Sequence, residues 1–527
     1  MIENSGVAWS SDRFMCRLLR LGDAGAGARL ALDAQPDRLT YAGLAATAGA
    51  VARTLSGYGV VAGDRVVIAV EYGPRWVSIL VGALAAGVVA VPVDRHAAPA
   101  DLAAYLRDTD PAVVVAEPDD VPRLADLLGA ARLVTVAECV SPDQEALPGR
   151  GVAVEDVVAP DGGVDAAHRK GVALVEPVPR SPGDAAMITY TSGTTGSPRG
   201  VTVSWGALAY QVTAGADRQR VAPDAVFVSV LPGHHLFELI AGCLVPLYAG
   251  ARVHFAASRL PADIAAAITA QRATDMVAVP ALLAALRRWL VAAPGRRVDP
   301  GLRRFFVGGA PLDPGLALAF QQLGFDVCQG YGLSEASPIV ATNTPWENRI
   351  GSVGRPLPGT EVRVDADGEL LARGPGVMSG YWGKPELTAE AINEDGWLRT
   401  GDLGRIDTDG YIHVTGRRKN LIVLPSGQNV QPEQVEAVLG RSDLVGEVCV
   451  LGHPTEHGEE LVAVVTASDR IRGELADAAD RERALTAEVR RLTAGLAPYQ
   501  RPRRIVVHDD ALPRTATRKI RRDGIVL

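Results

Sequence analysis

The chain has little of what marks secreted, membrane-spanning or nucleic-acid-coating proteins. Its 527 residues include only five cysteines, and no pair of them has metal-ligand spacing or suggests a disulfide framework, so a reducing cytoplasm fits best. The N-terminus lacks a basic start followed by an apolar core, which argues against a secretion signal. The net charge of −8 is mild for this length and gives no support to a nucleic-acid-coating role.

Lysine is also scarce. Only four of the 53 basic residues are lysines, and the other 49 are arginines. Arginine is therefore the default cation of this chain, and a lysine kept against that bias is a candidate for a role that arginine cannot fill. The four are Lys170, Lys384, Lys419 and Lys519, of which we interpret the first two as surface residues.

Long hydrophobic runs are missing, with one exception. The segment from Trp76 to Val93 has 18 uncharged residues, which is the crude length of a membrane span. Gly87 and Pro92 interrupt it, and its composition changes from Leu/Ala-rich to β-rich at Gly87. We therefore expect a buried helix that stops at Gly87, followed by a buried strand.

The apolar residues that are present, 47% of the chain, are ample for large cores and, with the length, predict two to four domains. From about Arg65 to Cys328, short strand-like runs alternate with alanine- and leucine-rich helical stretches. This alternation predicts an α/β fold, in which parallel-type sheets are covered by helices on both faces. No internal repeat or low-complexity tract is evident.

The pattern of residue types changes twice toward the C-terminus. Close-spaced turn signals predict a smaller β-rich part at about 354–417. In the last hundred residues, leucines and a valine at positions 485, 489, 492 and 496 recur at helical spacing, which predicts one helix packed on a small sheet. We expect a large N-terminal domain at 1–417 and a small α+β domain at 418–527, with a surface linker at 161–184.

The stretch TYTSGTTGSPRG, residues 189–200, is dense in hydroxyls and glycines. It follows a strand-like run, its glycines expose backbone N–H groups, and Arg199 adds positive charge. Donors and a cation around a flexible backbone suit a polyphosphate, although a solvent-exposed turn is the plain alternative. The stretch is not a GxxxxGK[ST] phosphate loop, because no lysine follows the glycine.

TYTSGTTGSPRG resembles the phosphate-binding signature of the adenylate-forming superfamily, which comprises acyl-CoA synthetases, luciferases and adenylation domains of peptide synthetases. The usual signature ends in Pro-Lys-Gly, so the departure at Arg199 suggests that the position needs charge more than a particular cation. The resemblance implies that ATP is bound by Thr191, Ser192, Gly193, Thr194, Thr195, Gly196 and Arg199.

Six further stretches match this superfamily in the expected order between about Leu39 and Arg522. They are LPGHHLFEL (231–239), VGGAPL (307–312), QGYGLSEASP (329–338), GWLRTGDLG (396–404), GRRKNLIVLPSGQNV (416–430) and LPRTATRKIRR (512–522). The resemblance adds to the ATP contacts Gly309, Ala310, Pro311, Gln329, Gly330, Tyr331, Gly332, Ser334, Glu335, Asp402, Arg417 and Lys519.

Two acidic residues have the chemistry that these implied roles require. Glu335 can hold Mg²⁺ against the phosphates as a hard oxygen ligand, together with Thr191, and its alternative role is that of a solvated loop acid. Asp402 is well placed to accept both ribose hydroxyls, and the alternative is a turn-stabilising aspartate.

Lys519 is the strongest single prediction. The segment from Arg501 to Asp523 uses arginine seven times and lysine once, at the position of the superfamily's catalytic lysine, although Arg518 replaces the usual preceding glycine. A compact ammonium can reach between a carboxylate and the α-phosphate, where a planar guanidinium fits less well. A solvated basic face is the ordinary alternative. Lys419 falls at the hinge position of the superfamily.

The acyl and pantetheine pocket is implied by three motifs. The resemblance assigns it His235, Phe237, Gly332, Ser426 and Gly427, with Pro425-Ser426-Gly427 replacing the more common Ser-Gly-Gly. His235 is expected between the ATP and acyl compartments, and a satisfied core histidine is the alternative.

The resemblance implies an acyl-CoA synthetase that uses ATP, Mg²⁺ and coenzyme A and is most like medium- and long-chain members. Glu238 is the only acid near the histidine motif, so an uncharged, hydrophobic acid is favoured over an amino acid. A ligase that loads a phosphopantetheinyl carrier protein and a non-catalytic nucleotide sensor remain alternatives. We expect no nucleic acid partner, no integral membrane association, and a monomer or homodimer.

Overall fold

The computed structural model describes residues 11–22, 27–34, 37–128, 132–135, 176–191, 198–293, 295–299, 301–426, 428–455, 458–514 and 520–527. The chain forms two compact units. Unit 1 comprises Met1–Val362 and Ala372–Leu398, and unit 2 comprises Arg363–Leu371 and Arg399–Leu527.

One sheet of unit 1 has seven strands in the order β18-β8-β7-β4-β3-β5-β6. Its strands β4, β3, β5 and β6 are parallel and valine-rich, as expected for strands buried on both faces, whereas β8 runs antiparallel to β7 and to β18. The bounds are β3 Arg65–Ala69, β4 Val89–Pro92, β5 Val113–Ala116, β6 Arg132–Thr135, β7 Ala185–Thr191, β8 Arg199–Ser204 and β18 Gly380–Tyr381.

A second sheet of unit 1 has nine strands in the order β15-β14-β13-β12-β11-β9-β10-β1-β2. Neighbouring strands from β13 to β1 are parallel, and the strands at both edges are antiparallel. The bounds are β1 Leu30–Asp33, β2 Arg38–Thr40, β9 Val226–Ser229, β10 Arg252–Phe255, β11 Asp275–Ala278, β12 Arg304–Val307, β13 Asp326–Gly332, β14 Ile339–Thr342 and β15 Arg355–Pro356.

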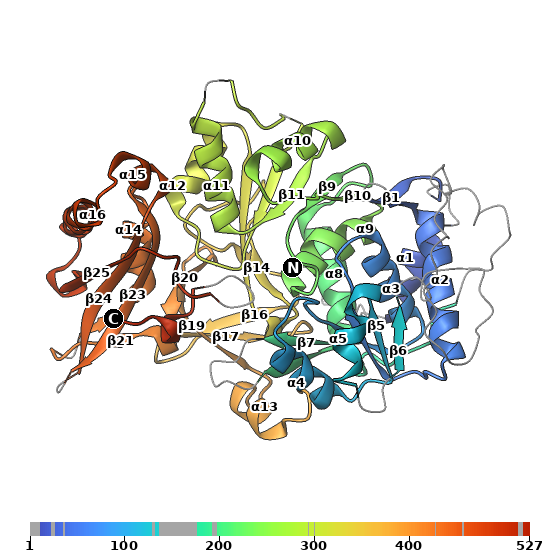
Figure 1. Ribbon diagram of the computed structural model, residues 1–527. Coiled ribbons are helices and arrows are strands. Elements are labelled where there is room, and N and C mark those ends of the chain that lie inside the picture. The colour runs from blue at the N-terminus through green and yellow to red at the C-terminus, as the bar shows by residue number, and fades with distance from the viewer. Residues whose placement is uncertain are drawn as a thin grey trace. The chain divides into compact units, whose positions relative to one another are not determined.

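Helices cover these sheets, and α2 and α3 pack against each other along their lengths (Figure 1). Their buried residues share one core with β3 and β4, in which Trp76 and Trp205 are 1% exposed. The helices are α1 Ser11–Arg20, α2 Tyr41–Gly57, α3 Pro74–Ala85, α4 Pro99–Thr109, η1 Pro118–Asp120, α5 Val121–Ala125, α8 Trp205–Gln219, η2 Glu238–Leu244, α9 Val245–Ala249, α10 Pro261–Gln271, α11 Pro280–Val291, α12 Pro314–Gln322, η3 Ser334–Ala336 and α13 Pro385–Ala391.

The long apolar run is a helix followed by a strand, as predicted. Helix α3 ends at Ala85, Gly87 adopts a φ of +72°, and β4 begins at Val89. Glycine reaches this left-handed conformation without the penalty that a side chain would impose. Among the described residues, no helix is both long and apolar enough to cross a membrane.

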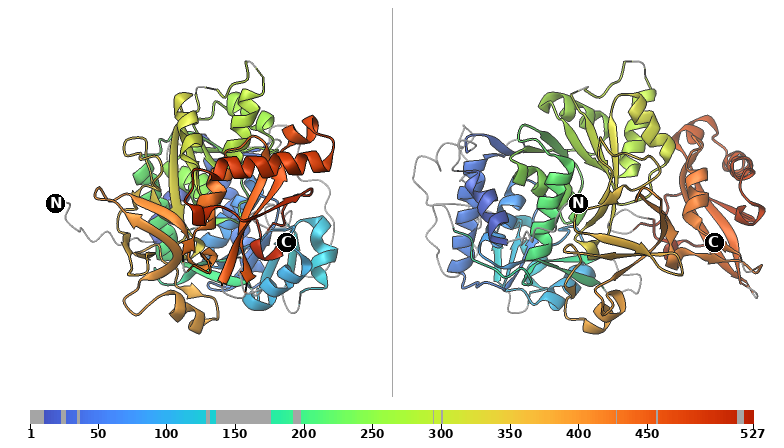
Figure 2. Two further views of the ribbon diagram at one scale, coloured as in Figure 1. Left: turned by 90° about the vertical axis from the view of Figure 1, so that its left-hand side faces the viewer. Right: turned by 180° about the vertical axis from the view of Figure 1, so that it is seen from behind.

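Unit 2 contains a three-stranded sheet of order β23-β24-β25 and the antiparallel pair β19·β20. Helix α16 lies on the three-stranded sheet, and its Leu485 and Val489 are fully buried there, which confirms the predicted helix on a small sheet (Figure 2). The boundaries between the units fall within β16 Glu361–Val364, β17 Glu369–Arg373 and β19 Leu398–Ile406. The other elements of unit 2 are β20 Ile412–Arg417, η4 Arg418–Asn420, β21 Ile422–Val423, β22 Asn429–Val430, α14 Pro432–Leu439, β23 Val445–Thr455, β24 Gly458–Ala467, α15 Asp469–Glu474, α16 Ala478–Thr493, η5 Pro498–Gln500, β25 Arg504–His508 and η6 Arg522–Gly524.

Candidate functional site

Two predicted motifs meet at one edge of the nine-stranded sheet. Strands β12 and β13 are parallel, with Val307 opposite Gln329; the chain leaves the sheet after Val307, whereas β13 continues to Gly332 beside β14. In open parallel sheets, ligands bind at the carboxyl ends of the strands. The predicted contacts at this edge are exposed or half-buried and thus accessible to a ligand: Gly309, Ala310, Pro311, Gln329, Gly330, Tyr331 and Gly332.

Glu335 lies just beyond this edge, in the single-turn helix η3 with Ser334. Its backbone carbonyl accepts a hydrogen bond from the N–H of Met378 at 2.8 Å. The Tyr381 hydroxyl donates to the Glu335 carboxylate, with 2.9 Å between the hydroxyl oxygen and Oε1. The backbone and the carboxylate of this predicted metal ligand are therefore each held by one hydrogen bond from the 378–381 segment.

The hairpin of β7 and β8 holds both ends of the hydroxyl-rich loop. Thr191 ends β7 as the sequence predicts, and it lies opposite Arg199, the first residue of β8. The Arg199 guanidinium lies over the Tyr381 ring, 5.5 Å from its centroid. The loop residues between these ends, Ser192, Gly193, Thr194, Thr195 and Gly196, lie outside the described residues.

The histidine motif follows β9 and contacts the segment after β12. The His235 ring is 4.2 Å from the His234 ring, and burial lowers the pKa of His234. The Phe237 ring packs against the backbone of Gly308, where an added Cβ would lie 3.0 Å from Cζ of that ring. The structure therefore brings Phe237 together with the segment that contains Gly309.

Glu238 is a buried acid at the start of the π-helix η2. Its side chain is 0% exposed and accepts a hydrogen bond from the Ser229 hydroxyl. Burial raises the pKa of Glu238 to about 8, because the charged form would lose its hydration there. The group is therefore mostly protonated at neutral pH and offers no full negative charge to the ammonium of an amino acid.

In unit 2, the antiparallel pair β19·β20 brings together Asp402 and Arg417, two of the three predicted nucleotide contacts of that unit. Asp402 lies opposite Arg417 in register, and the Arg417 Nε donates to Asp402 Oδ1 at 2.8 Å. Asp402 is 3% exposed, whereas Arg417 is exposed.

The hinge and pantetheine candidates of unit 2 are at its surface. Lys419 in η4 is exposed, and so is Ser426, whose hydroxyl donates to the Gln428 side chain at 3.1 Å. Gly427 and Lys519 lie outside the described residues.

Both segments that flank 515–519 are tied to the body of unit 2. On one side, the Leu512 N–H and the Arg514 guanidinium donate to the Glu447 carboxylate. On the other side, Arg522 donates to Glu436 at 2.6 Å. The described residues on both sides of 515–519 are thus anchored to unit 2.

Sequence reasoning missed two residues in GYWGKPE. It gave no role to Tyr381 and only a surface position to Lys384. Lys384 is half-buried, and its ammonium donates to the Pro198 carbonyl at 2.8 Å, beside Arg199. The scarcity of lysine was a usable signal for Lys384, whereas no local pattern pointed to Tyr381.

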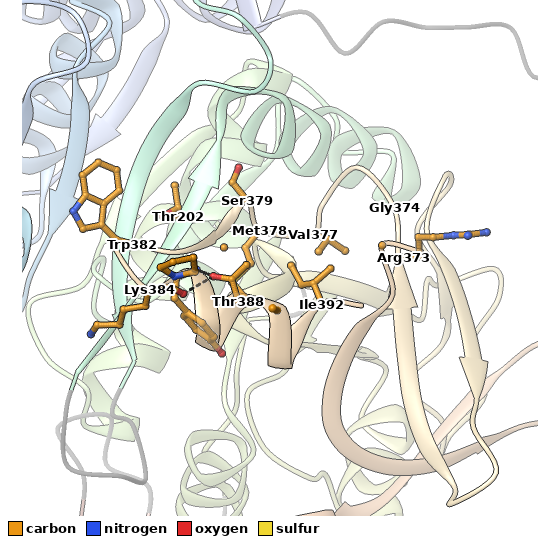
Figure 3. Close-up of a pocket in the computed structure, with 16 residues that line it drawn as sticks. Thr202, Arg373, Gly374, Val377, Met378, Ser379, Trp382, Lys384, Thr388 and Ile392 are labelled. Atoms are coloured by element: carbon orange, nitrogen blue, oxygen red, sulfur yellow. Dashed lines mark hydrogen bonds between the residues drawn. The ribbon is translucent and has the colours of Figure 1, made fainter. Parts of the chain in front are cut away.

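A pocket of about 880 Å³ lies next to this segment, between α13 and the residues that precede it (Figure 3). Met378, Tyr381, Thr388 and Ile392 contribute to its lining. Tyr381 and Lys384, the two residues that sequence reasoning missed, also belong to its lining. The pocket is therefore adjacent to the Glu335 site rather than part of the sheet edge.

Comparison with known families gives two matches. The model of the AMP-binding enzyme family matches residues 23–382, and the model of the AMP-binding enzyme C-terminal domain matches residues 434–519.

Curated relatives extend over most of the chain. An indoleacetate–CoA ligase of Aromatoleum aromaticum is 32% identical and covers 93% of this chain and 93% of its own. A sulfoacetate–CoA ligase of Cupriavidus necator is 31% identical over 82% of this chain and 84% of its own.

Among solved structures, ATP-bound MatB from Rhodopseudomonas palustris has a TM-score of 0.80 and 29% identity, with 98% of both chains covered. The motifs at β12 and β13, the strand pairs β7·β8 and β19·β20, and these matches all point to the same family. The chain belongs to the AMP-binding enzyme family.

Proposed function

We propose that the protein is an ATP-dependent acid–CoA ligase that activates a hydrophobic carboxylic acid. The acid attacks the α-phosphate of ATP, giving an acyl-adenylate and pyrophosphate, and the acyl group then passes to the thiol of CoA with release of AMP. The observation that carries the proposal is Glu335, held by Tyr381 beside Arg199 at the end of the hydroxyl-rich hairpin. The family match and the named activities of the relatives support the same reaction class.

Positioning and charge neutralisation do most of the work in such a reaction. Arg199 lies opposite Thr191 at the base of the hydroxyl-rich loop and supplies positive charge there. The carboxyl ends of β12 and β13 supply the surface for the adenine. In unit 2, Asp402 offers a carboxylate for the ribose hydroxyls and Arg417 an exposed guanidinium. We propose these groups as the nucleotide contacts.

The residues at Glu335 fit Mg²⁺ in a particular way. No cluster of three histidine, cysteine or acidic side chains that could hold a metal occurs among the described residues. Mg²⁺ is commonly held by one or two carboxylates together with substrate phosphates, so a single oriented carboxylate suffices if ATP provides the rest. Bound there, Mg²⁺ would neutralise phosphate charge, and Glu335, with the Thr191 hydroxyl, would hold it.

We propose that Lys519 neutralises the acid and the α-phosphate during adenylate formation. The functional domains are then 1–417 and 418–527, and the smaller one turns about Lys419 between the two half-reactions. Ser426 and Gly427 would then line the path of the pantetheine arm, with Gly332. The exposed positions of Lys419 and Ser426 and the anchors on both sides of 515–519 support this division of labour.

The hydrophobic acid is the finer part of the proposal. His235 and Phe237 are proposed to border the acyl pocket, and the mostly protonated Glu238 supports an acid without an ammonium group. The relatives are named for sulfoacetate and for indoleacetate, so family membership alone does not fix the substrate. A fatty acid or another bulky apolar acid is our choice, in a cytoplasmic setting.

A panel of carboxylic acids tests this function. Purified protein with Mg–ATP should exchange labelled pyrophosphate into ATP only when an acid is added, with apolar acids above sulfonated or amino acids. CoA consumption should follow the same order, and a phosphopantetheinyl carrier protein should not replace CoA. Nucleotide binding without acid-dependent exchange would instead identify a nucleotide sensor.

A further inference from the structure

Tyr381 joins two parts of the site that belong to different sheets. It lies in the two-residue strand β18, opposite Val201 of β8, two residues beyond Arg199. Its hydroxyl reaches Glu335, which follows β13 of the nine-stranded sheet. Its ring lies under the Arg199 guanidinium. One side chain therefore contacts both the proposed metal ligand and the proposed phosphate ligand.

We propose that Tyr381 is a positioning residue that orients the Glu335 carboxylate toward Mg²⁺ and keeps Arg199 beside it without an ion pair. This inference rests on the proposed function for the role of Glu335, but its geometry does not depend on the identity of the acid.

Two hydrogen bonds and a glycine fix the backbone around Tyr381. Its N–H donates to the Thr388 hydroxyl at 2.9 Å, and the N–H of Trp382 donates to the Gly200 carbonyl at 2.7 Å. Gly380 has a φ of +141°, and an added Cβ there would lie 2.7 Å from Thr388, so only glycine fits. The hydroxyl of Tyr381 is thus held at one place relative to β8.

The electrostatics suit a hydrogen-bond donor. Tyr381 is 8% exposed, and its hydroxyl lies 2.9 Å from Glu335 Oε1, to which it donates. A hydrogen bond to a charged carboxylate is stronger than one between neutral groups and also fixes its orientation.

Tyr381 also gives both charged groups a neutral partner. No ion pair joins Glu335 to Arg199 within the part of the chain that the structure describes, although both contact Tyr381. A guanidinium paired directly with Glu335 would compete with a cation for the carboxylate oxygens. Tyr381 keeps the carboxylate available to Mg²⁺ and the guanidinium available to phosphate.

Tyr381→Phe tests the proposal, since it removes the hydroxyl and leaves the ring under Arg199. We expect the Mg²⁺ concentration for half-maximal pyrophosphate exchange to rise about tenfold, as the loss of one hydrogen bond to a charged group implies. The rate at saturating Mg²⁺ should stay within about twofold of the wild type, because Glu335 itself is retained.

Tyr210→Phe is the matched control. The Tyr210 hydroxyl donates to the Pro358 carbonyl at 2.9 Å and contacts the Thr360 hydroxyl at 2.8 Å, and neither partner belongs to the proposed site. Its loss should lower the melting temperature without moving the Mg²⁺ dependence. An unchanged Mg²⁺ dependence in a folded Tyr381→Phe protein, or an equal shift in Tyr210→Phe, would overturn the proposal.

Calorimetric titration of Mg–ATP into the protein without any acid separates the two proposals. A weaker, Mg²⁺-dependent affinity in Tyr381→Phe but not in Tyr210→Phe supports the positioning role even if no acid is ever activated. Equal Mg–ATP affinities in wild type and Tyr381→Phe, measured at limiting Mg²⁺, count against it even if the ligase activity is confirmed.

Discussion

The two units each place a carboxylate near an arginine by means of an antiparallel strand pair, but they do so differently. In unit 2, Arg417 donates directly to Asp402 across β19·β20 at 2.8 Å. In unit 1, Glu335 and Arg199 form no ion pair among the described residues, and both contact Tyr381 instead. A directly paired carboxylate has part of its hydrogen-bonding capacity used by the arginine, whereas one that accepts from a neutral hydroxyl keeps its charge for a cation.

This difference fits the proposed roles of the two carboxylates. Asp402 would accept hydrogen bonds from neutral ribose hydroxyls, for which a nearby guanidinium is no obstacle. Glu335 would hold Mg²⁺, for which a paired guanidinium would be a competitor. Substitutions of the individual partners should therefore have different effects in the two units.

The largest effect is expected at neither carboxylate but at Lys519. Lys519→Ala should abolish adenylate formation, with a loss of about a thousandfold or more in pyrophosphate exchange, since the charge between two anions is removed. A supplied acyl-adenylate should still be converted to the thioester when CoA is added. Loss of both half-reactions in a folded protein would contradict the separate roles.

Glu335→Gln and Asp402→Asn compare the two carboxylates directly. Glu335→Gln should lower kcat about a hundredfold and weaken Mg²⁺ activation, because an amide is a poor ligand for a hard cation. Asp402→Asn should mainly raise KM for ATP, by about tenfold, and leave the Mg²⁺ dependence in place. If both variants showed the same Mg²⁺ dependence, the two carboxylates would not have the separate roles proposed for them.

Arg199 should tolerate a change that preserves its charge. Arg199→Lys is expected to keep activity within about fivefold of wild type, because the position supplies charge to phosphate, while Arg199→Ala should lose about thirtyfold in kcat/KM. Steady-state kinetics with varied ATP measures both. A loss in Arg199→Lys as large as in Arg199→Ala would show that the guanidinium shape, including its contact with the Tyr381 ring, is what matters.

The smallest effect on activity is expected at Glu238, where stability should change instead. Its pKa is raised to about 8 in the folded protein from an ordinary value of 4.5, so the native state holds the proton more tightly. The contribution of Glu238 to the free energy of unfolding is therefore greatest at low pH and is lost as the pH rises from about 4.5 to 8.

Glu238→Gln removes this titration while keeping a neutral side chain of the same size. Between pH 5.5 and 8, its melting temperature should fall by about 5 °C less than that of the wild type. Burial raises the pKa of the neighbouring Tyr72 and Cys243, so neither group titrates in this range. If the melting temperatures of the wild type and of Glu238→Gln change equally with pH across this range, Glu238 is charged in the folded state.

Much of the fold could be predicted because its signals are local. Buried parallel strands appear as short valine-rich runs, and the apolar run from Trp76 to Val93 divides at Gly87 as the change in composition indicates. The pairing of Asp402 with Arg417 is also nearly local, since a short hairpin connects their strands.

The contacts of Tyr381 and Lys384 could not be predicted in this way. Tyr381 reaches Glu335 across 46 positions, and Lys384 reaches Pro198 across 186. Both depend on the pairing of β18 with β8, a two-residue strand that no periodicity in the sequence announces. The residues implied at 192–196, Gly427 and Lys519 lie outside the described residues and remain predictions from the motifs.

The most direct test of the account is pyrophosphate exchange by the wild-type protein at varied Mg²⁺, with and without an apolar carboxylic acid. The account predicts exchange that requires both the acid and Mg²⁺ and that disappears in Lys519→Ala. Exchange that continues undiminished without the lysine, or that is absent with every acid while ATP still binds, would contradict it.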